Sequence, residues 1–395
     1  MTAIFCGFAA LLPIVCVVAP KGTVVLLLLA ALLAIPTYWW VNRRMPVPDL
    51  RIAIALTLFV LWCAIASAWS ADATRSIVLV LRIGVIFAAG MALFPIAAAL
   101  DDAARARVGR WLIGGFVLAL VLVSAEIALG YPLLRLFEAA EAGKKLVWFN
   151  RSAVALALIV WPVTGLLWAR GLGWKVLAIP GLLGIASVFL ESAAATHGLV
   201  VGLAAALLVL CHRKAGFLVT TAAGAMAFVG MPFAALEMHN QGWHGADWLP
   251  ASAQHRVEIW NFSVHRIAEK SLLGWGFDGS RHMGMLYPDP SDTGRTVAAL
   301  HPHSVPLQVM LELGTVGAVM ALALLWLIAR RLDGVSGRTR VFGQALFVAA
   351  LAIGSVAHGA WQNWWLALVI SVALLVPLTA APASTGNDPL NGLPP

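Results

Sequence analysis

Charged side chains are scarce in this chain, since Asp, Glu, Lys and Arg make up 11% of its 395 residues, whereas soluble domains carry roughly 25%. Hydrophobic residues reach 61% and fall in apolar runs long enough to cross a bilayer. A soluble globular domain is therefore excluded, and a polytopic membrane protein is predicted. The first apolar run lacks a basic segment before it and is followed at once by another, so it is not expected to be a cleaved signal.

Cysteines and metal-binding motifs are also rare. The four cysteines lie within apolar runs or at the end of one, which argues against a disulfide framework or a CxxC metal site. The sequence has no HExxH motif and no cluster of Asp and His, so neither a metal nor another cofactor is expected. The Gly-rich stretch GWGFDGSR (274–281) lacks the strand–helix context of a nucleotide-binding loop and is expected to form a tight turn.

The apolar runs predict an all-α polytopic membrane protein with about twelve transmembrane helices in a single domain, 1–380. The spans are expected at 3–19, 22–41, 52–71, 77–100, 111–130, 153–169, 176–190, 195–212, 215–236, 305–329, 341–360 and 363–380. A large loop, 237–304, separates the ninth span from the tenth, and apolar residues about one turn apart around Trp260 predict an amphipathic helix within it. The segment 381–395 is rich in Pro, Gly and Asn and is expected to be a disordered tail.

The distribution of Lys and Arg predicts the orientation of the bundle. With the N-terminus in the cytoplasm, the cytoplasmic loops contain 14 basic residues, whereas the short loops on the other side contain only Lys21 and Arg75. Both termini, including the tail, are therefore expected in the cytoplasm, and the loop 237–304 outside it. This asymmetry also accounts for the net charge of +8, so the bilayer is the expected partner and a nucleic acid is not.

The stretch HPHSVPLQVMLELGTVG (301–317) places polar side chains at the mouth of a membrane helix. Ser304 is expected to cap this helix, so that His303 lies just before a helix N-terminus. The positive end of a helix disfavours imidazolium, and a neutral imidazole is what a general base near pH 7 requires. His303 is therefore the candidate base, with His301 beside it as a candidate for substrate binding. A capping or interface-anchoring role for His303 is the alternative.

Gln308 and Glu312 continue from Ser304 at intervals of four residues and form one polar stripe on the predicted helix. Such a stripe must face protein or water rather than lipid. A supporting role, in which Glu312 pairs with an arginine or a backbone group, is favoured over catalysis. Trp260 of the amphipathic helix is expected to support the same region.

Four arginines are candidates for binding a phosphate group, because a guanidinium group binds phosphate oxygens in pairs. Arg151, Arg256 and Arg281 lie in the outer segments next to aromatic residues or histidine. Arg82 differs because it lies inside the predicted span 77–100, where a charge is a functional candidate by default. For each of them, a charge that faces solvent or lipid headgroups is the alternative.

The stretch around His303 resembles a known signature. His303–Ser304, then nine residues, then Gly314 and, three further on, Gly317 is similar to the signature of the O-antigen ligases and related polymerases of the bacterial cell envelope, shared with bacterial protein O-oligosaccharyltransferases. Further similar stretches are FNRSA (149–153), ESAAATHG (191–198) and RVEIW…SLLGWGFDGSR (256–281). They cover the second half of the chain, whereas the first 140 residues match in hydropathy alone.

The resemblance implies a metal-independent, inverting glycosyl transfer on the periplasmic side of the bacterial inner membrane. The donor would be a glycan on undecaprenyl pyrophosphate, and the acceptor a terminal sugar of lipid A–core. The resemblance assigns His303 as the base, Arg256 as a pyrophosphate-binding arginine and Arg151 as a second one. One departure matters, because many members place an arginine where this chain has Ala193, so Arg151, Arg281 or Arg82 would have to replace it.

Alternative functions remain open at this point. Within the same superfamily, the protein could be a polymerase that extends a glycan on its own lipid carrier, or a protein-glycosylating enzyme. From another class, it could be a transporter of lipid-linked sugars. A transporter is expected to carry charged or broken helices at mid-membrane. Here the polar residues gather at one edge of the membrane and in one loop, which favours an enzyme.

Overall fold

The computed structural model describes residues 1–130, 145–212, 215–283, 300–335 and 337–380. Within these ranges the chain folds into helices without strands, so the predicted all-α class is confirmed. The principal helices are α1 (Thr2–Val18), α2 (Thr23–Asn42), α3 (Leu50–Ala66), α4 (Ala73–Ala98), α5 (Asp102–Ala128), α7 (Lys145–Leu167), α8 (Ala178–Phe189), α9 (Ala193–Cys211), α10 (Ala215–Ala225), α11 (Met231–Asn240), α12 (Ala251–Glu269), α14 (Val305–Asp333), α15 (Gly337–Val356) and α16 (Asn363–Ala373). The expected tail 381–395 lies outside the described residues.

The helices agree with the predicted membrane spans. Nine stretches among the described residues are long and apolar enough to cross a membrane, and Thr2–Val18 and Asn363–Thr379 are shorter apolar helices. One of the nine, Phe149–Phe189, contains two predicted spans, because the chain turns at Gly171 and Gly173, which have φ of +90° and +55°. Each of the twelve predicted spans therefore corresponds to a helix, and the chain is a multi-pass membrane protein.

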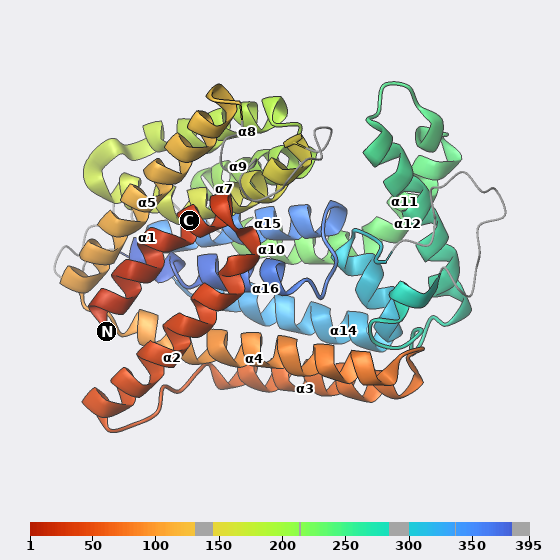
Figure 1. Ribbon diagram of the computed structural model, residues 1–395, viewed down its shortest axis with the longest axis horizontal. Coiled ribbons are helices and arrows are strands. Elements are labelled where there is room, and N and C mark those ends of the chain that lie inside the picture. The colour runs from red at the N-terminus through yellow and green to blue at the C-terminus, as the bar shows by residue number, and fades with distance from the viewer. Residues whose placement is uncertain (131–144, 213–214, 284–299, 336, 381–395) are drawn as a thin grey trace.

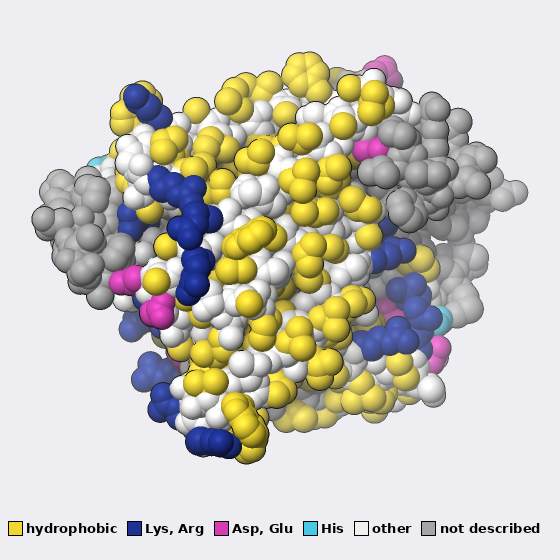
Figure 2. Space-filling view, turned by 60° about the vertical axis from the view of Figure 1, so that its left-hand side comes forward, with side chains coloured by type: hydrophobic (Ala, Val, Ile, Leu, Met, Phe, Trp, Pro, Cys, Tyr) yellow, Lys and Arg dark blue, Asp and Glu magenta, His cyan; other side chains and the backbone are white. Residues whose placement is uncertain are grey.

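The surface has the pattern of a membrane protein. Figure 2 shows hydrophobic side chains across the middle of one face, with Lys and Arg gathered towards opposite edges. Large apolar side chains such as Leu32, Leu81 and Phe189 are exposed, as helices in contact with lipid require. α11 and α12 form a lobe at one end of the molecule, on the right of Figure 1. Which end faces the periplasm stays a prediction.

The interior is built around α7, which the apolar faces of neighbouring helices cover. Its indole side chain Trp161 is fully buried, and α9 and α15 pack closely against it. Glycines permit this approach, because a Cβ on Gly202 of α9 would lie 2.5 Å from the Trp161 ring. The first turns of α7 and α9 are tied together by the Ser192 hydroxyl, which donates to the side-chain oxygen of Asn150 at 2.6 Å. This contact fixes the start of α7, which carries Arg151.

α14 is interrupted at Gly314, and this break organises the site. Gly314 has φ +65° and ψ −165°, a conformation essentially reserved for glycine. The loop 271–276 lies against the break, because the backbone N–H groups of Trp275 and Gly276 each donate to α14 carbonyls at 2.9 Å. In return, the Thr315 N–H donates to the Ser271 carbonyl at 2.8 Å. A Cβ on Gly314 would overlap the backbone of this loop, which explains the first glycine of the signature.

The predicted amphipathic helix is α12. Val257, Trp260 and Ile267 are buried against α11 and α14, whereas the opposite face of α12 is more open. The predicted Gly-rich turn follows α12. The Ser76 hydroxyl of α4 donates to the Phe277 carbonyl at 2.7 Å, so the turn is held between α4 and α14.

Candidate active site

The segment from His301 to Ser304 leads into α14 and is fixed on both sides. Ser304 is buried and caps the helix as predicted, because its hydroxyl oxygen accepts a hydrogen bond from a backbone N–H of the first turn at 3.5 Å. The indole N–H of Trp260 donates to the Pro302 carbonyl at 2.9 Å. His303 itself has φ +53°, a left-handed conformation that is uncommon outside glycine. These contacts hold the two histidines in one arrangement.

The ring of His303 is held in one tautomer by its partner. Its Nδ1 atom lies 3.3 Å from the Ala357 carbonyl oxygen, which can only accept a hydrogen bond. Nδ1 therefore carries the proton, and Nε2 keeps a lone pair. Burial lowers the pKa of His303, the Ala357 contact partly opposes this, and the charges of Arg256 and His255 lower it further. The lowered pKa favours the neutral imidazole at pH 7, and burial rather than the helix N-terminus is its largest cause.

The second histidine is neutral as well. The Nδ1 atom of His301 accepts the backbone N–H of His303 at 3.2 Å, and its Nε2 atom lies 2.9 Å from the amide nitrogen of Gln362. Burial lowers the pKa of His301 to about 4, and the charges of His303 and Arg281 add to the effect. The two rings pack edge to face, with centroids 4.3 Å apart. A side chain at Gly359 would meet the His301 ring at 2.9 Å, so glycine is required there.

Arg256 lies near enough to His303 for its charge to lower the pKa of that ring. We call Arg256, Arg151 and His358 together the α12 side. Arg256 is partly buried, yet it makes no hydrogen bond or ion pair with any residue that the structure describes. Burial lowers its pKa, although an arginine stays charged in proteins. Arg151 lies 5.9 Å from the Trp364 ring. A buried guanidinium group without a carboxylate is unfavourable unless an anion joins it.

The pKa of His358 is affected by several of these groups. His358 is buried in the turn between α15 and α16, where its ring packs against Trp364 and Trp365. Its pKa falls to about 3, mainly through burial and further through the charges of Arg256, His303 and Arg151. His358 therefore packs among aromatic rings, within the electrostatic influence of Arg256 and Arg151.

His301 also lines a cavity of about 470 Å³, which we call the α4 cavity. It is lined by Asp72, Thr74, Arg75, Val78, Leu79, Arg82, Asp278, Arg281, His301, Gln308, Gly359, Trp361, Gln362 and Asn363. Arg75 and Arg281 share the buried carboxylate of Asp278, with Nε–Oδ2 distances of 3.0 Å and 3.3 Å. Arg82 has no ion pair or hydrogen bond within the described ranges.

Glu312 connects the parts of this site. Its fully buried carboxylate accepts three hydrogen bonds, from the Gln308 amide at 2.9 Å, the Trp361 indole N–H at 2.6 Å and the Asp278 backbone N–H at 2.7 Å. Gln308 in turn accepts the Ala360 N–H at 2.7 Å. Glu312 thus joins α14 to the Gly-rich turn and to the turn between α15 and α16. This agrees with the supporting role expected for the polar stripe.

The structure brings the candidate residues to one end of the bundle but divides them. His303, Arg256 and Arg151 belong to the α12 side, whereas Arg82, Arg281 and His301 line the α4 cavity, with Glu312, Gln308 and Trp260 in support. Sequence reasoning missed the residues that complete the two sides, which are Arg75, Asp278, Ala357, His358, Trp361, Gln362 and Asn363. A signal existed for Arg75 alone, because it lies seven residues before Arg82 and so shares its helix face.

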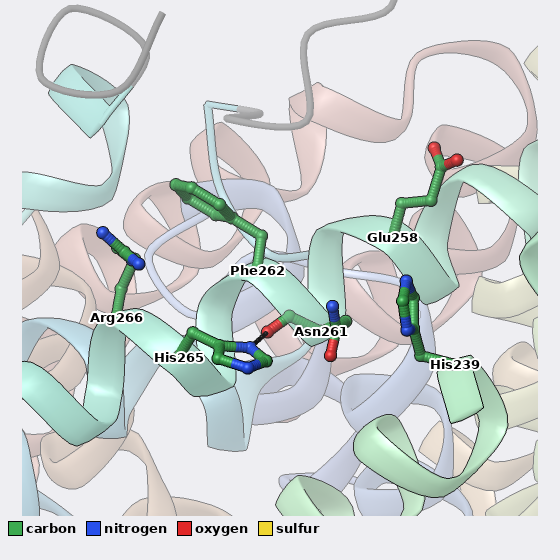
Figure 3. Close-up of a pocket in the computed structure, with 6 residues that line it drawn as sticks. All are labelled: His239, Glu258, Asn261, Phe262, His265 and Arg266. Atoms are coloured by element: carbon green, nitrogen blue, oxygen red, sulfur yellow. Dashed lines mark hydrogen bonds between the residues drawn. The ribbon is translucent and has the colours of Figure 1, made fainter. Parts of the chain in front are cut away.

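A second hollow of about 460 Å³ lies on the face of α12 opposite to Arg256 (Figure 3). Glu258, Asn261 and His265 recur at helical spacing on this face, and the His265 ring bonds the Asn261 carbonyl at 2.9 Å. Its arginine, Arg266, is paired with Glu269 at 2.8 Å. The hollow therefore points away from the histidine pair and has no unpaired guanidinium group. In the part of the chain that is described, no group of His, Cys, Asp and Glu is arranged to hold a metal ion.

Residues 178–322 match the family model described as O-antigen ligase. This segment is therefore similar to the O-antigen ligase superfamily. It is also 33% identical over 135 residues to a protein of Rickettsia bellii described as "Putative polysaccharide ligase", and 30% identical over 135 residues to proteins described in similar words from Rickettsia conorii and Rickettsia felis. Each alignment covers 33% of this chain and 33% of the relative's length.

The match to the O-antigen ligase superfamily covers only part of the site. It contains Arg256, Arg281, His303 and Glu312, together with the broken helix α14 as far as residue 322. Arg151, the α4 residues and the turn between α15 and α16 lie outside it. The site is therefore completed by helices beyond the matched segment, which have to be interpreted from their own contacts.

Proposed function

We propose that this protein is an O-antigen ligase-like glycosyltransferase. It moves a glycan from undecaprenyl pyrophosphate to a sugar hydroxyl of lipid A–core on the periplasmic side of the bacterial inner membrane. The observation that carries the proposal is the pairing of a neutral His303, whose Nδ1 bonds the Ala357 carbonyl, with a neighbouring Arg256 that no described carboxylate neutralises.

Arg256 binds the pyrophosphate of the donor. A guanidinium group presents two parallel N–H donors to phosphate oxygens, and such charge-assisted bonds are strong where water is partly excluded. Arg151 adds a second cation from the start of α7. Because pyrophosphate is already a good leaving group, stabilising its developing charge lowers the barrier to breaking the glycosidic bond. The role of the two arginines is therefore electrostatic.

His303 accepts the proton of the acceptor hydroxyl at Nε2. As the bond to the leaving group lengthens, the anomeric carbon acquires oxocarbenium character, and the hydroxyl attacks from the opposite face. The anomeric configuration is therefore inverted. The imidazolium that forms keeps its Nδ1–H bond to the Ala357 carbonyl, which orients and stabilises it. A positioned base of this kind contributes roughly 10²–10⁴-fold to the rate.

A deletion strain tests the proposed function. For a ligase, we expect lipopolysaccharide core without attached polymer, and long glycan that accumulates on the lipid carrier. Core capped with a single repeat unit would instead identify a polymerase, and normal lipopolysaccharide with altered glycoproteins a protein-modifying enzyme. Transfer by the purified protein between isolated donor and acceptor, lost in a His303 variant that still binds donor, would connect the phenotype to this site.

A further inference from the structure

The α4 cavity contains polar groups that its own residues leave without partners. The Oδ1 atom of Asn363 is buried and accepts no hydrogen bond. Arg82 lines the cavity from α4, and its exposed side chain has no partner among the described residues. A buried polar atom without a partner is uncommon in folded proteins, so the Asn363 oxygen calls for a donor from a ligand or a solvent molecule, and the unpaired Arg82 can bind an anion. Here one is an acceptor and the other a donor.

The charges that line the cavity nearly balance. Arg75, Arg82 and Arg281 face Asp72 and Asp278, which leaves an excess of one positive charge. Asp278 is shared between two arginines, and Asp72 also accepts the Arg75 backbone N–H at 2.9 Å as the cap of α4. The cavity is therefore complementary to a single anionic group, such as a carboxylate or a phosphate.

An anion alone does not satisfy this lining. The Asn363 oxygen has no partner within the protein, and the Asp72 carboxylate can accept further hydrogen bonds, so the lining can take O–H or N–H donors from a ligand. Sugar hydroxyls provide such donors, and the ring of Trp361 adds an apolar wall. A volume of about 470 Å³ lies within the range of small-molecule sites in proteins. A sugar that bears one acidic group fits both the size and the polarity.

The hydrogen-bond acceptors of the α4 cavity distinguish it from the α12 side. Pyrophosphate has no strong donors, so carboxylate and amide acceptors would oppose it. Arg256, without a described carboxylate partner, suits it better. His301 lines the cavity and packs on His303, whose pKa is lowered by the charge of Arg256. An inverting displacement places the nucleophile and the leaving group on opposite faces of the anomeric carbon, so the acceptor and the pyrophosphate need separate subsites.

We propose that the α4 cavity binds an acidic sugar of the acceptor, one that carries a carboxylate or a phosphate next to the sugar that receives the glycan. This inference rests on the proposed glycosyl transfer. Arg82 recognises the acidic group, and the Asn363 amide accepts a hydroxyl of the same sugar. Both are binding residues, and neither takes part in the proton transfer.

The test compares Arg82→Gln and Asn363→Ala with Arg51→Gln, a control at an exposed arginine near the start of α3. Purified full-length proteins in vesicles are assayed with the natural donor. The acceptors are native lipid A–core and the same material after phosphates are removed and carboxyl groups are reduced. Initial rates give separate KM values for donor and acceptor.

For Arg82→Gln, we expect the acceptor KM to rise about tenfold, the range of a lost charge-assisted hydrogen bond, while donor KM and kcat stay unchanged. With the neutralised acceptor, the wild type should already show the raised KM, and the variant should add little to it. Asn363→Ala should raise the KM for both acceptors, because it removes a hydroxyl contact rather than a charge contact. The Arg51 control should match the wild type.

Three results would overturn the inference. A raised donor KM with an unchanged acceptor KM would mean that the cavity holds the pyrophosphate. An equal loss with both acceptors in Arg82→Gln would mean that the acidic group is not recognised, and no change in either variant would mean that the cavity is not a subsite. If the wild type transfers nothing, the proposed function fails instead. In that case, the binding affinity of the native core oligosaccharide is compared with that of the neutralised one, which tests the inference independently of transfer.

Discussion

Two groups of arginines lie near one histidine pair, and they are built differently. On the α12 side, Arg256 is partly buried with no described carboxylate beside it. In the α4 cavity, Arg75 and Arg281 share Asp278, and amide groups surround them. The residue type is the same, but the first side offers an uncompensated charge and the second a nearly balanced, hydrogen-bonding surface. The difference predicts a polyanion on one side and a sugar with one acidic group on the other.

The largest effect is expected at His303, the proposed base, because proton transfer depends on it whichever side binds the donor. We expect His303→Asn to lower kcat by roughly 10²–10⁴-fold, because the variant cannot accept the proton at Nε2. Asparagine tolerates the positive φ of this position better than alanine, so the fold should be retained. Initial rates and donor binding are measured on the same preparation. His255→Asn is the matched control on α12, and a comparable loss there would contradict the assignment.

Arg256→Gln tests the α12 side by itself. We expect the Kd for donor to rise roughly 10–100-fold, since a bond between a guanidinium group and a phosphate is lost, while acceptor binding is unchanged. Arg256→Lys should recover part of the loss, because lysine keeps the charge but not the paired donors. Arg266→Gln on the other face of α12 serves as control. A larger effect on acceptor than on donor would reverse the assignment of the two sides.

Gly314→Ala should damage the cavity side more than the α12 side. An alanine held in the left-handed backbone conformation of Gly314 would lower the free energy of unfolding by about 1–3 kcal/mol. Its Cβ would also overlap the loop that leads to Asp278. We expect a lower unfolding temperature in detergent and weaker acceptor binding. Gly7→Ala, where a Cβ meets open space within α1, should leave both unchanged. A Gly314 variant as stable as the Gly7 variant would contradict the role of the break.

Glu312→Gln should produce a smaller effect that reaches both sides. The variant keeps the size of the side chain, but its amide nitrogen cannot accept a hydrogen bond, so at least one of the three bonds is lost and the others lose the charge that strengthens them, each bond being worth about 1 kcal/mol or somewhat more. We expect kcat to fall severalfold and acceptor KM to rise, because the turns that carry Ala357 and Asp278 loosen together. Glu312→Ala should be worse. If Glu312→Gln left kcat and both KM values unchanged, the carboxylate would have no positioning role.

The pH profile gives the smallest but most specific signal. A base with a lowered pKa remains neutral and active at pH 7, and it loses activity only when protonated at lower pH. We therefore expect kcat/KM for the acceptor to be flat near pH 7 and to fall on an acid limb below about 6.5, the ordinary value for histidine. Arg256→Gln should move this limb upward, since it removes a positive charge near His303. A limb above 7 in the wild type would contradict the burial of the ring.

The sequence predicted the helices well, because apolar length alone defines a membrane span and no long-range contact is needed. It also proposed His303, Arg256 and Glu312 as site residues from the stretches that resemble one family, and their roles stay predictions. It could not find Asp278 as the partner of Arg75, because the two are 203 positions apart and meet only when α4 packs on the Gly-rich turn. Likewise, the Ala357 carbonyl that fixes the His303 tautomer carries no mark in the sequence, since every residue has a carbonyl.

The central claim is that His303 is a neutral base protonated at Nδ1, and its ring can be observed directly. Nitrogen NMR of the purified protein with labelled histidine, compared with His303→Asn to assign the signal, reports the tautomer and charge of the ring. The account predicts a neutral Nδ1–H ring at pH 7 that becomes protonated only below about pH 6.5. An imidazolium at pH 7, or a neutral ring with its proton on Nε2, would contradict it.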